Sequence, residues 1–179
     1  MKAPVLLMAL ACFISFGWAM KKFFVKPDGK THGMQAIYLF GTLFMLLHVG
    51  LIVFRYEFHA VATLGGMVLY AAALALFWWT IQVNRARPLS FAFSQDQPQH
   101  LVINGPYRYM RHPFYCAYML AWLAGALAVP EPWLLATAGV MFFLYRQAAQ
   151  QEEQKFAESE FAENYKEYQR RTWMFFPRM

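Results

Sequence analysis

Residues 36–54 read AIYLFGTLFMLLHVGLIVF, an apolar run in which His48 is the one side chain able to carry a charge near neutral pH. A helix needs about 20 such residues to cross a bilayer. Further apolar runs cover residues 3–20, 60–83, 114–129 and 133–144. The whole chain is 59% hydrophobic and only 15% charged, far from the composition of soluble domains. The sequence therefore predicts an all-α integral membrane protein with about five transmembrane helices.

Charges flank these runs unequally, which predicts how the chain is oriented. Lys2 and Arg55 lie at one end of the expected bundle. All the other Lys and Arg residues fall at the other end: Lys21, Lys22, Lys26, Lys30, Arg85, Arg87, Arg108, Arg111, Arg146, Lys155, Lys166, Arg170, Arg171 and Arg178. By the positive-inside rule, the N-terminus is outside and the C-terminus is cytosolic. The net charge of +6 thus reflects topology and attraction to anionic lipids, and it does not indicate a nucleic acid partner.

Some features of the apolar runs allow two interpretations. Residues 3–20 form either a transmembrane helix or a removed signal peptide, and the first is favoured because Lys21 and Lys22 follow directly. Cys12 and Cys116 lack the spacing of a metal or redox pair. An ionisable residue such as His48 is a functional-site hypothesis in a membrane helix. The favoured alternative is a neutral imidazole bonded to a carbonyl or hydroxyl of a neighbouring helix.

The segment before the fourth apolar run is rich in groups that carry chemistry. Residues 99–115 read QHLVINGPYRYMRHPFY. Gly105 and Pro106 predict a turn, and Pro113 suits the first turn of the helix that follows. His112 is therefore expected at the mouth of the fourth helix.

The last two apolar runs are joined by Pro-Glu-Pro at residues 130–132, which predicts an antiparallel helical hairpin. Counting equal distances from Glu131 along both arms brings Glu152 and Glu153 within about one helical turn of the height of Arg111 and His112. The fifth run is only about 18 Å long as a helix, shorter than a hydrocarbon core of about 30 Å. The helix is therefore expected to continue through its polar residues toward the cytosol.

Beyond Glu153 the apolar residues keep a helical spacing. Ala157, Phe161, Tyr165 and Tyr168 alternate with Lys and Glu, which predicts an amphipathic cytosolic C-terminal helix that lies on the membrane or folds over the hairpin. Residues 173–177, WMFFP, are apolar enough to dock on the rest of the protein.

Several kinds of site are weighed for the cluster of His100, Tyr107, Arg111, His112 and Tyr115 with the two carboxylates. No compact ligand spacing supports a metal site, and an arginine beside a histidine disfavours a cation. No Ser or Cys lies in a nucleophile-like turn, and one glycine makes no phosphate cradle. A structural alternative is an ion pair that merely ties two helix ends together. The density of Tyr, His and Arg favours a functional site.

These residues resemble a known family. The segment GPYRYMRHPFY at residues 105–115, Glu152 with Glu153, FAENYKEY at residues 161–168 and Pro177 are similar to the isoprenylcysteine carboxyl methyltransferase and phospholipid methyltransferase family. The likeness covers about the last 80 residues. The chain lacks the extra N-terminal helices of eukaryotic members, so it resembles a short prokaryotic-type member located in the inner membrane.

The resemblance implies S-adenosylmethionine as methyl donor. The implied donor-pocket residues are His100, Leu101, Val102, Gly105, Tyr107, His112, Tyr115 and Glu152. Glu153 and Arg171 would face the acceptor as catalytic residues. Residues 1–179 would form one membrane domain, with scaffold helices in 1–98 and the cofactor motif, hairpin and C-terminal helix in 99–179.

The implied acceptor is a lipophilic small molecule or lipidated group such as a prenylcysteine carboxylate, reached from the lipid bilayer. A carboxylate acceptor needs no base, whereas an amine or thiol must lose a proton to one. A phospholipid amine, a small thiol, an NADPH-dependent membrane reductase and a non-enzymatic membrane scaffold are the alternatives. The sequence leaves the acceptor and the oligomeric state open.

Overall fold

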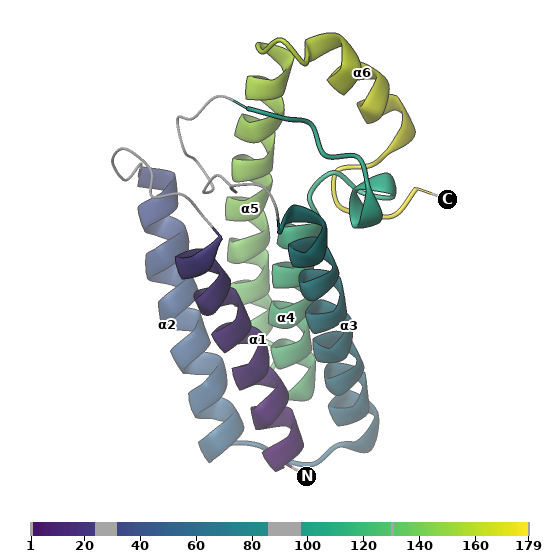
Figure 1. Cartoon of the computed structure of the whole chain (residues 1–179). Helices are drawn as coiled ribbons and strands as arrows, with labels where there is room; N and C mark the ends of the chain where they lie inside the picture. The colour runs from purple at the N-terminus through teal and green to yellow at the C-terminus, as the bar shows by residue number, and fades with distance from the viewer. Residues whose placement is uncertain (1, 24–31, 86–97, 130, 179) are drawn as a thin grey trace.

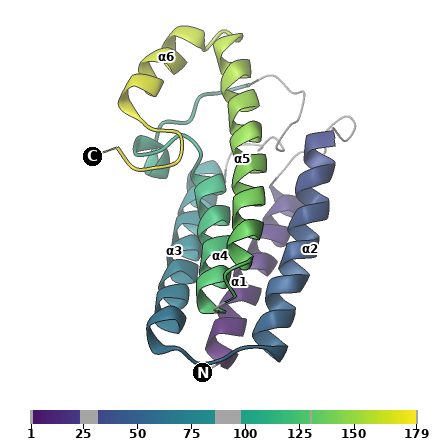
Figure 2. The same ribbon diagram turned by 180° about the vertical axis from the view of Figure 1, so that it is seen from behind.

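The chain folds as a bundle of long helices with a smaller cap at one end (Figure 1). The computed structural model describes residues 2–23, 32–85, 98–129 and 131–178. The elements in chain order are α1 (Lys2–Lys22), α2 (His32–Phe54), α3 (Ala60–Asn84), the 3-10 turn η1 (Gly105–Arg108), α4 (Pro113–Ala128), α5 (Leu134–Ala157) and α6 (Ala162–Arg171). Both views place α6 and the C-terminal segment at the end opposite the N-terminus (Figure 2). We call the end with η1 and α6 the motif end.

The bundle has the helices of a membrane protein. Within the described residues, three helices, α1, α2 and α3, are long and apolar enough to cross a bilayer, and α4 is a shorter apolar helix. Large apolar side chains point outward from them, such as Leu39, which is 64% exposed, and Val61, which is 88% exposed. Such surfaces suit lipid and not water. The prediction of an all-α integral membrane protein is confirmed.

Small residues let α3 and α4 approach each other closely. A Cβ atom on Gly66 would lie 2.7 Å from the Cβ of Ala128 and 2.8 Å from the carbonyl oxygen of Ala124. Only a glycine fits this crossing, as at other close crossings of membrane helices. The close contact holds α4, and with it the site at its N-terminus, against α3.

His48 lies in a buried polar contact between helices. Its Nε2 is 2.8 Å from Oγ1 of Thr137 on α5, and the Thr137 hydroxyl donates to the carbonyl of Leu134 at 2.7 Å. The Thr137 oxygen therefore accepts from His48. The favoured interpretation of His48, a bond to a hydroxyl of a neighbouring helix, agrees with the structure. Its Nδ1 and the Tyr70 hydroxyl both face the space left by Gly125.

The hairpin of α4 and α5 forms as predicted, although Pro130 lies outside the described residues. α5 runs through Arg146 without a break and ends at Ala157. The predicted C-terminal helix does not run unbroken through residues 157–161, because a turn separates α5 from α6. There Ser159 donates to the carbonyl of Phe156 at 2.9 Å and accepts from the N–H of Phe161 at 3.1 Å. These local bonds compete with helix continuation, and α6 folds back over the motif end.

The cations follow the predicted distribution along the bundle. Lys2 and Arg55 lie at the end opposite the motif end, at the start of α1 and just after α2. Lys21 and Lys22 close α1 at the motif end, where η1 and α6 also carry their cations. Lys26, Lys30 and Arg87 lie outside the described residues.

Candidate functional site

The first wall of the site is η1, which rests on the last turn of α3. Gly105 begins this turn with a φ of 60°, and a Cβ atom there would lie 2.4 Å from Cγ2 of Val83. Glycine adopts this left-handed conformation without strain, so η1 can approach α3. The side-chain amide of Asn84 donates to the hydroxyl of Tyr107 at 3.2 Å. The turn is thereby fixed to α3 by both shape and hydrogen bonding.

The second wall comes from residues 172–178, which we call the strap. A parallel bridge joins Met110 to Trp173. The N–H of Arg111 donates to the carbonyl of Trp173 at 2.9 Å, and that of His112 donates to the carbonyl of Met174 at 3.1 Å. The two site residues are therefore held by the backbone of a segment that lies far away in the sequence.

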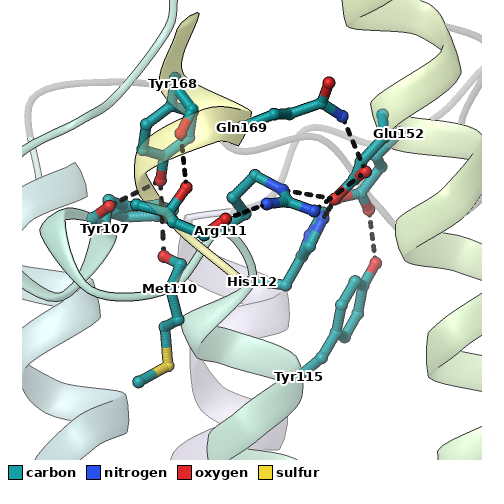
Figure 3. A network of polar contacts seen from close by, with 10 residues as sticks. Tyr107, Met110, Arg111, His112, Tyr115, Glu152, Tyr168 and Gln169 are labelled. Atoms are coloured by element: carbon teal, nitrogen blue, oxygen red, sulfur yellow. Dashed lines mark hydrogen bonds and ion pairs between the residues drawn. The ribbon is translucent and has the colours of Figure 1, made fainter. Parts of the chain in front are cut away.

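Arg111 and His112 point toward α5 (Figure 3), and both contact Glu153 of that helix. Arg111 Nε donates to Glu153 at 2.7 Å, and His112 Nε2 lies 3.1 Å from the same oxygen. Gln169 of α6 donates to the other carboxylate oxygen at 3.0 Å, and Arg111 also donates to the carbonyl of Thr172. Glu153 thus ties α5 to α6 and to the two residues before α4, and Arg111 joins this group to the strap.

The neighbouring carboxylate, Glu152, has different partners. It lies 3.4 Å from His112 Nδ1 and accepts a hydrogen bond from the hydroxyl of Tyr115. The His112 ring stacks on the Tyr115 ring with their centroids 5.7 Å apart. The predicted meeting of Arg111 and His112 with Glu152 and Glu153 is therefore confirmed as geometry.

The charged groups of this cluster shift each other's pKa values. Burial alone would raise the pKa of the Glu153 carboxyl, but hydrogen bonds from His112 and Arg111 and their charges lower its pKa to about 2. Burial would lower the pKa of His112, but its hydrogen bonds to Glu152 and Glu153 and their negative charges raise it above the usual 6.5. His112 is accordingly biased toward the imidazolium form, which donates from both nitrogens.

A cavity of about 950 Å³ opens beside this cluster. Its polar part lies at the motif end, where Arg111, His112 and Glu152 form part of the wall. Its apolar part reaches between α1, α2 and α4, where Phe16 and Trp122 line it. The volume is at the upper end of the range of ordinary ligand pockets.

The structure separates the predicted site residues into two groups. The residues that line the cavity are His100, Leu101, Val102, Tyr107, His112, Tyr115 and Glu152. Three others do not line it. Gly105 faces α3, Glu153 lies behind His112 with 12% of its side chain exposed, and Arg171 is 74% exposed and paired with Glu167 on α6.

Sequence reasoning missed other members of the site. Tyr118 and Trp122 follow Tyr115 at helical spacing and line the same cavity, so the face of α4 was a readable signal. Gln169 and the strap carbonyls gave no such signal, since their role depends on how α6 folds back.

Comparison with known proteins places this site within a matched region. A family model described as phospholipid methyltransferase matches residues 60–164, more than half of the chain. The matched region includes α3, η1, the hairpin and the Glu152-Glu153 pair. No match is found among curated proteins.

Proposed function

We propose, since the chain belongs to the phospholipid methyltransferase family, that this membrane methyltransferase takes its methyl group from S-adenosylmethionine and transfers it to a lipophilic acceptor. The observation that carries the proposal is the grouping of Glu152, His112 and Tyr115, three residues of the matched region, on the wall of one large cavity. The donor would bind at the polar end of this cavity, and the acceptor would enter from its apolar end.

The chemistry of the polar end fits the groups of such a donor. When bound, the donor supplies an electrophilic methyl group on a positively charged sulfur. Tyr115, Tyr118 and Tyr145 line the cavity, and aromatic rings would favour a cation beside them. Glu152, with 34% of its side chain exposed, would accept hydrogen bonds from an ammonium or hydroxyl groups. His100, Leu101 and Val102 would supply the wall against the adenine.

Glu153 receives a different role from the one that the resemblance implies. Because it lies behind the cavity wall and binds Arg111 and His112, we assign it as a positioning residue. It would hold the imidazole so that Nδ1 faces Glu152. Arg171 lies exposed on α6, and we do not include it in the reacting site.

The apolar end of the cavity supports a lipophilic acceptor. It lies between helices that are apolar enough to cross the bilayer, so an acyl or prenyl chain would be buried there. Methyl transfer then depends on alignment and on exclusion of water. A carboxylate acceptor, as in a prenylcysteine, needs no base. An amine, as in a phospholipid, needs one, and Glu152 is the candidate because the imidazolium form of His112 cannot accept a proton.

The orientation follows from the charges. Cations concentrate at the motif end, so we place that end in the cytosol, where S-adenosylmethionine is made, and the N-terminus outside. A prokaryotic inner membrane is the proposed location. Residues 1–98 and 99–179 would act as one domain, because α1 and α2 line the same cavity as η1 and the hairpin.

Methyl transfer from labelled S-adenosylmethionine tests the proposal. Protein purified in detergent is incubated with prenylcysteine, aminophospholipid and small-thiol acceptors in parallel, as wild type, as Glu152→Gln and as the control Glu163→Gln. We expect label in one lipophilic acceptor, lost in Glu152→Gln and kept in the control on α6. No label in any acceptor, together with binding of NADPH and none of S-adenosylhomocysteine, would replace the methyltransferase with a reductase.

A further inference from the structure

Large aromatic side chains are exposed on the strap and beside η1. Trp173 is 54% exposed, Phe176 is 65% exposed and Tyr109 is 44% exposed. The Tyr109 ring contacts the ring of Trp79 on α3 at a centroid distance of 6.3 Å, and Trp79 is itself 44% exposed on an apolar helix. Trp and Tyr at the ends of membrane helices are typical of the headgroup level of a bilayer. These rings extend the lipid-facing surface of α3 onto the strap.

The strap also reaches the depth of the apolar part of the hairpin. Phe175 contacts Phe142, which belongs to the apolar run 133–144, with ring centroids 5.8 Å apart. The thiol of Cys116, one turn into the apolar helix α4, donates to the carbonyl of Phe175 at 2.8 Å. The strap thus lies level with the ends of the apolar segments.

Arginines lie at the same end of the bundle as these aromatic rings, and the backbone N–H of Arg178 donates to the carbonyl of Tyr109 at 3.1 Å. Arg85 follows α3, Arg108 ends η1 and Arg178 lies on the strap, and all three are exposed. Arg178 also donates to the carbonyl of Arg170. Neither residues 98–112 nor residues 172–178 contain an Asp or Glu. An aromatic surface at headgroup depth that carries arginines and no carboxylates in these two segments is complementary to anionic lipid phosphates.

We propose that the strap and η1 form a lipid anchor that seats Trp173 and Phe176 in the headgroup region and binds anionic phospholipids through Arg85, Arg108 and Arg178. The anchor is coupled to the site, because carbonyls of Trp173 and Met174 accept the backbone N–H groups of Arg111 and His112. Lipid bound to the strap would therefore stabilise the wall of the donor pocket. Only this last link rests on the proposed function.

Fluorescence quenching of Trp173 tests the anchor without any methyl donor. The full chain is placed in nanodiscs, and the emission that Trp173→Phe removes is taken as the Trp173 signal. We expect brominated lipids to quench this signal and aqueous iodide to leave it nearly unchanged. Quenching by iodide with none by brominated lipid would place Trp173 in water, on a surface for a soluble partner, and would overturn the proposal.

Headgroup selectivity tests the arginines. Brominated phosphatidylglycerol is compared with brominated phosphatidylcholine at equal mole fraction, and quenching of the Trp173 signal should be severalfold stronger with the anionic lipid, since each arginine near an anionic surface contributes about fivefold. The double variant Arg108→Gln with Arg178→Gln should lose this preference. Arg55→Gln, at the opposite end of the bundle, is the matched control and should keep it. Equal quenching by both lipids, or a preference unchanged in the double variant, would refute the anchor. Inorganic phosphate should not compete with the lipid, and full competition by it would show a simple phosphate site instead.

Discussion

Replacement of Glu153 by Gln preserves the size of the side chain but removes the charge that joins the hairpin to α6. Arg111, 11% exposed, would keep its charge without its carboxylate partner at 2.7 Å. Folding lowers the pKa of Glu153 from 4.5 to about 2, which at roughly 1.4 kcal/mol per pKa unit corresponds to about 3–4 kcal/mol, and solvent screening of this partly exposed carboxylate reduces that figure. Loss of one partner of a buried pair typically costs a similar amount, about 3–5 kcal/mol. We therefore expect Glu153→Gln to lower the free energy of unfolding by about 3 kcal/mol.

The sign of the pH dependence gives this prediction a second test. The folded pKa of Glu153 is lowered, so its contribution is complete above pH 4.5 and is lost as the pH falls toward 2. The folded pKa of His112 is raised, so its contribution is complete below pH 6.5 and is lost as the pH rises through the folded value. The stability difference between wild type and Glu153→Gln should thus be largest between pH 4.5 and 6.5.

Thermal unfolding in detergent at a series of pH values measures this difference, with Glu163→Gln on the exposed face of α6 as control. We expect a clear fall in Tm for Glu153→Gln, greatest near pH 5 to 6, and little change for the control. A Tm equal to that of wild type, or a difference that does not vary between pH 5 and 9, would refute the assignment of Glu153 as the residue that holds Arg111 and His112.

Three further substitutions test other parts of the account. Gly105→Ala forces a Cβ to within 2.4 Å of Val83 Cγ2 and should weaken the binding of S-adenosylhomocysteine, measured by calorimetry. Adding Val83→Ala should restore part of the affinity. No effect of either change would show that the contact between Gly105 and Val83 does not hold η1 in place. Gly125→Ala places a Cβ 2.2 Å from His48 Nδ1 and 2.9 Å from the Tyr70 hydroxyl. The free energy of unfolding should fall by about 1–3 kcal/mol, as for an overpacked core, and Tm should fall with it. Gly139→Ala, where nothing lies within 4 Å, is the control and should leave Tm nearly unchanged. Tyr115→Phe removes the hydroxyl that donates to Glu152. It should weaken donor binding about tenfold, which is equivalent to about 1.4 kcal/mol of binding free energy, with little loss of stability. Unchanged affinity would argue against a role for Glu152 at the donor.

The positions of the site residues along the two arms of the hairpin could be predicted from the sequence, because the rise per residue of a helix is fixed and the Pro-Glu-Pro turn sets the register. This is why Arg111 and His112 were expected level with Glu152 and Glu153. It could not be predicted that Glu152 lines the cavity while Glu153 binds Arg111 and His112 behind it. Adjacent residues on a helix point about 100° apart, and which one faces a cavity depends on the rotation of α5 against its neighbours.

The cap formed by α6 and the strap at the motif end could not be predicted from the sequence either. The bridge between Met110 and Trp173 is formed by backbone atoms of segments far apart in the chain, and backbone pairing of this kind carries no side-chain pattern. The turn at Ser159 interrupts a helical spacing that continues in the sequence on both sides. Local hydrogen bonds decided the end of α5 there, and the periodicity of apolar residues did not reveal it.

Donor binding can be measured without knowledge of the acceptor. Calorimetric titration of S-adenosylhomocysteine into the protein in nanodiscs should show binding to wild type and to Glu163→Gln, and at least a tenfold weaker affinity for Glu152→Gln. Equal affinity of wild type and Glu152→Gln, or binding of NADPH with none of S-adenosylhomocysteine, would contradict a methyl-donor pocket between the hairpin, η1 and α6.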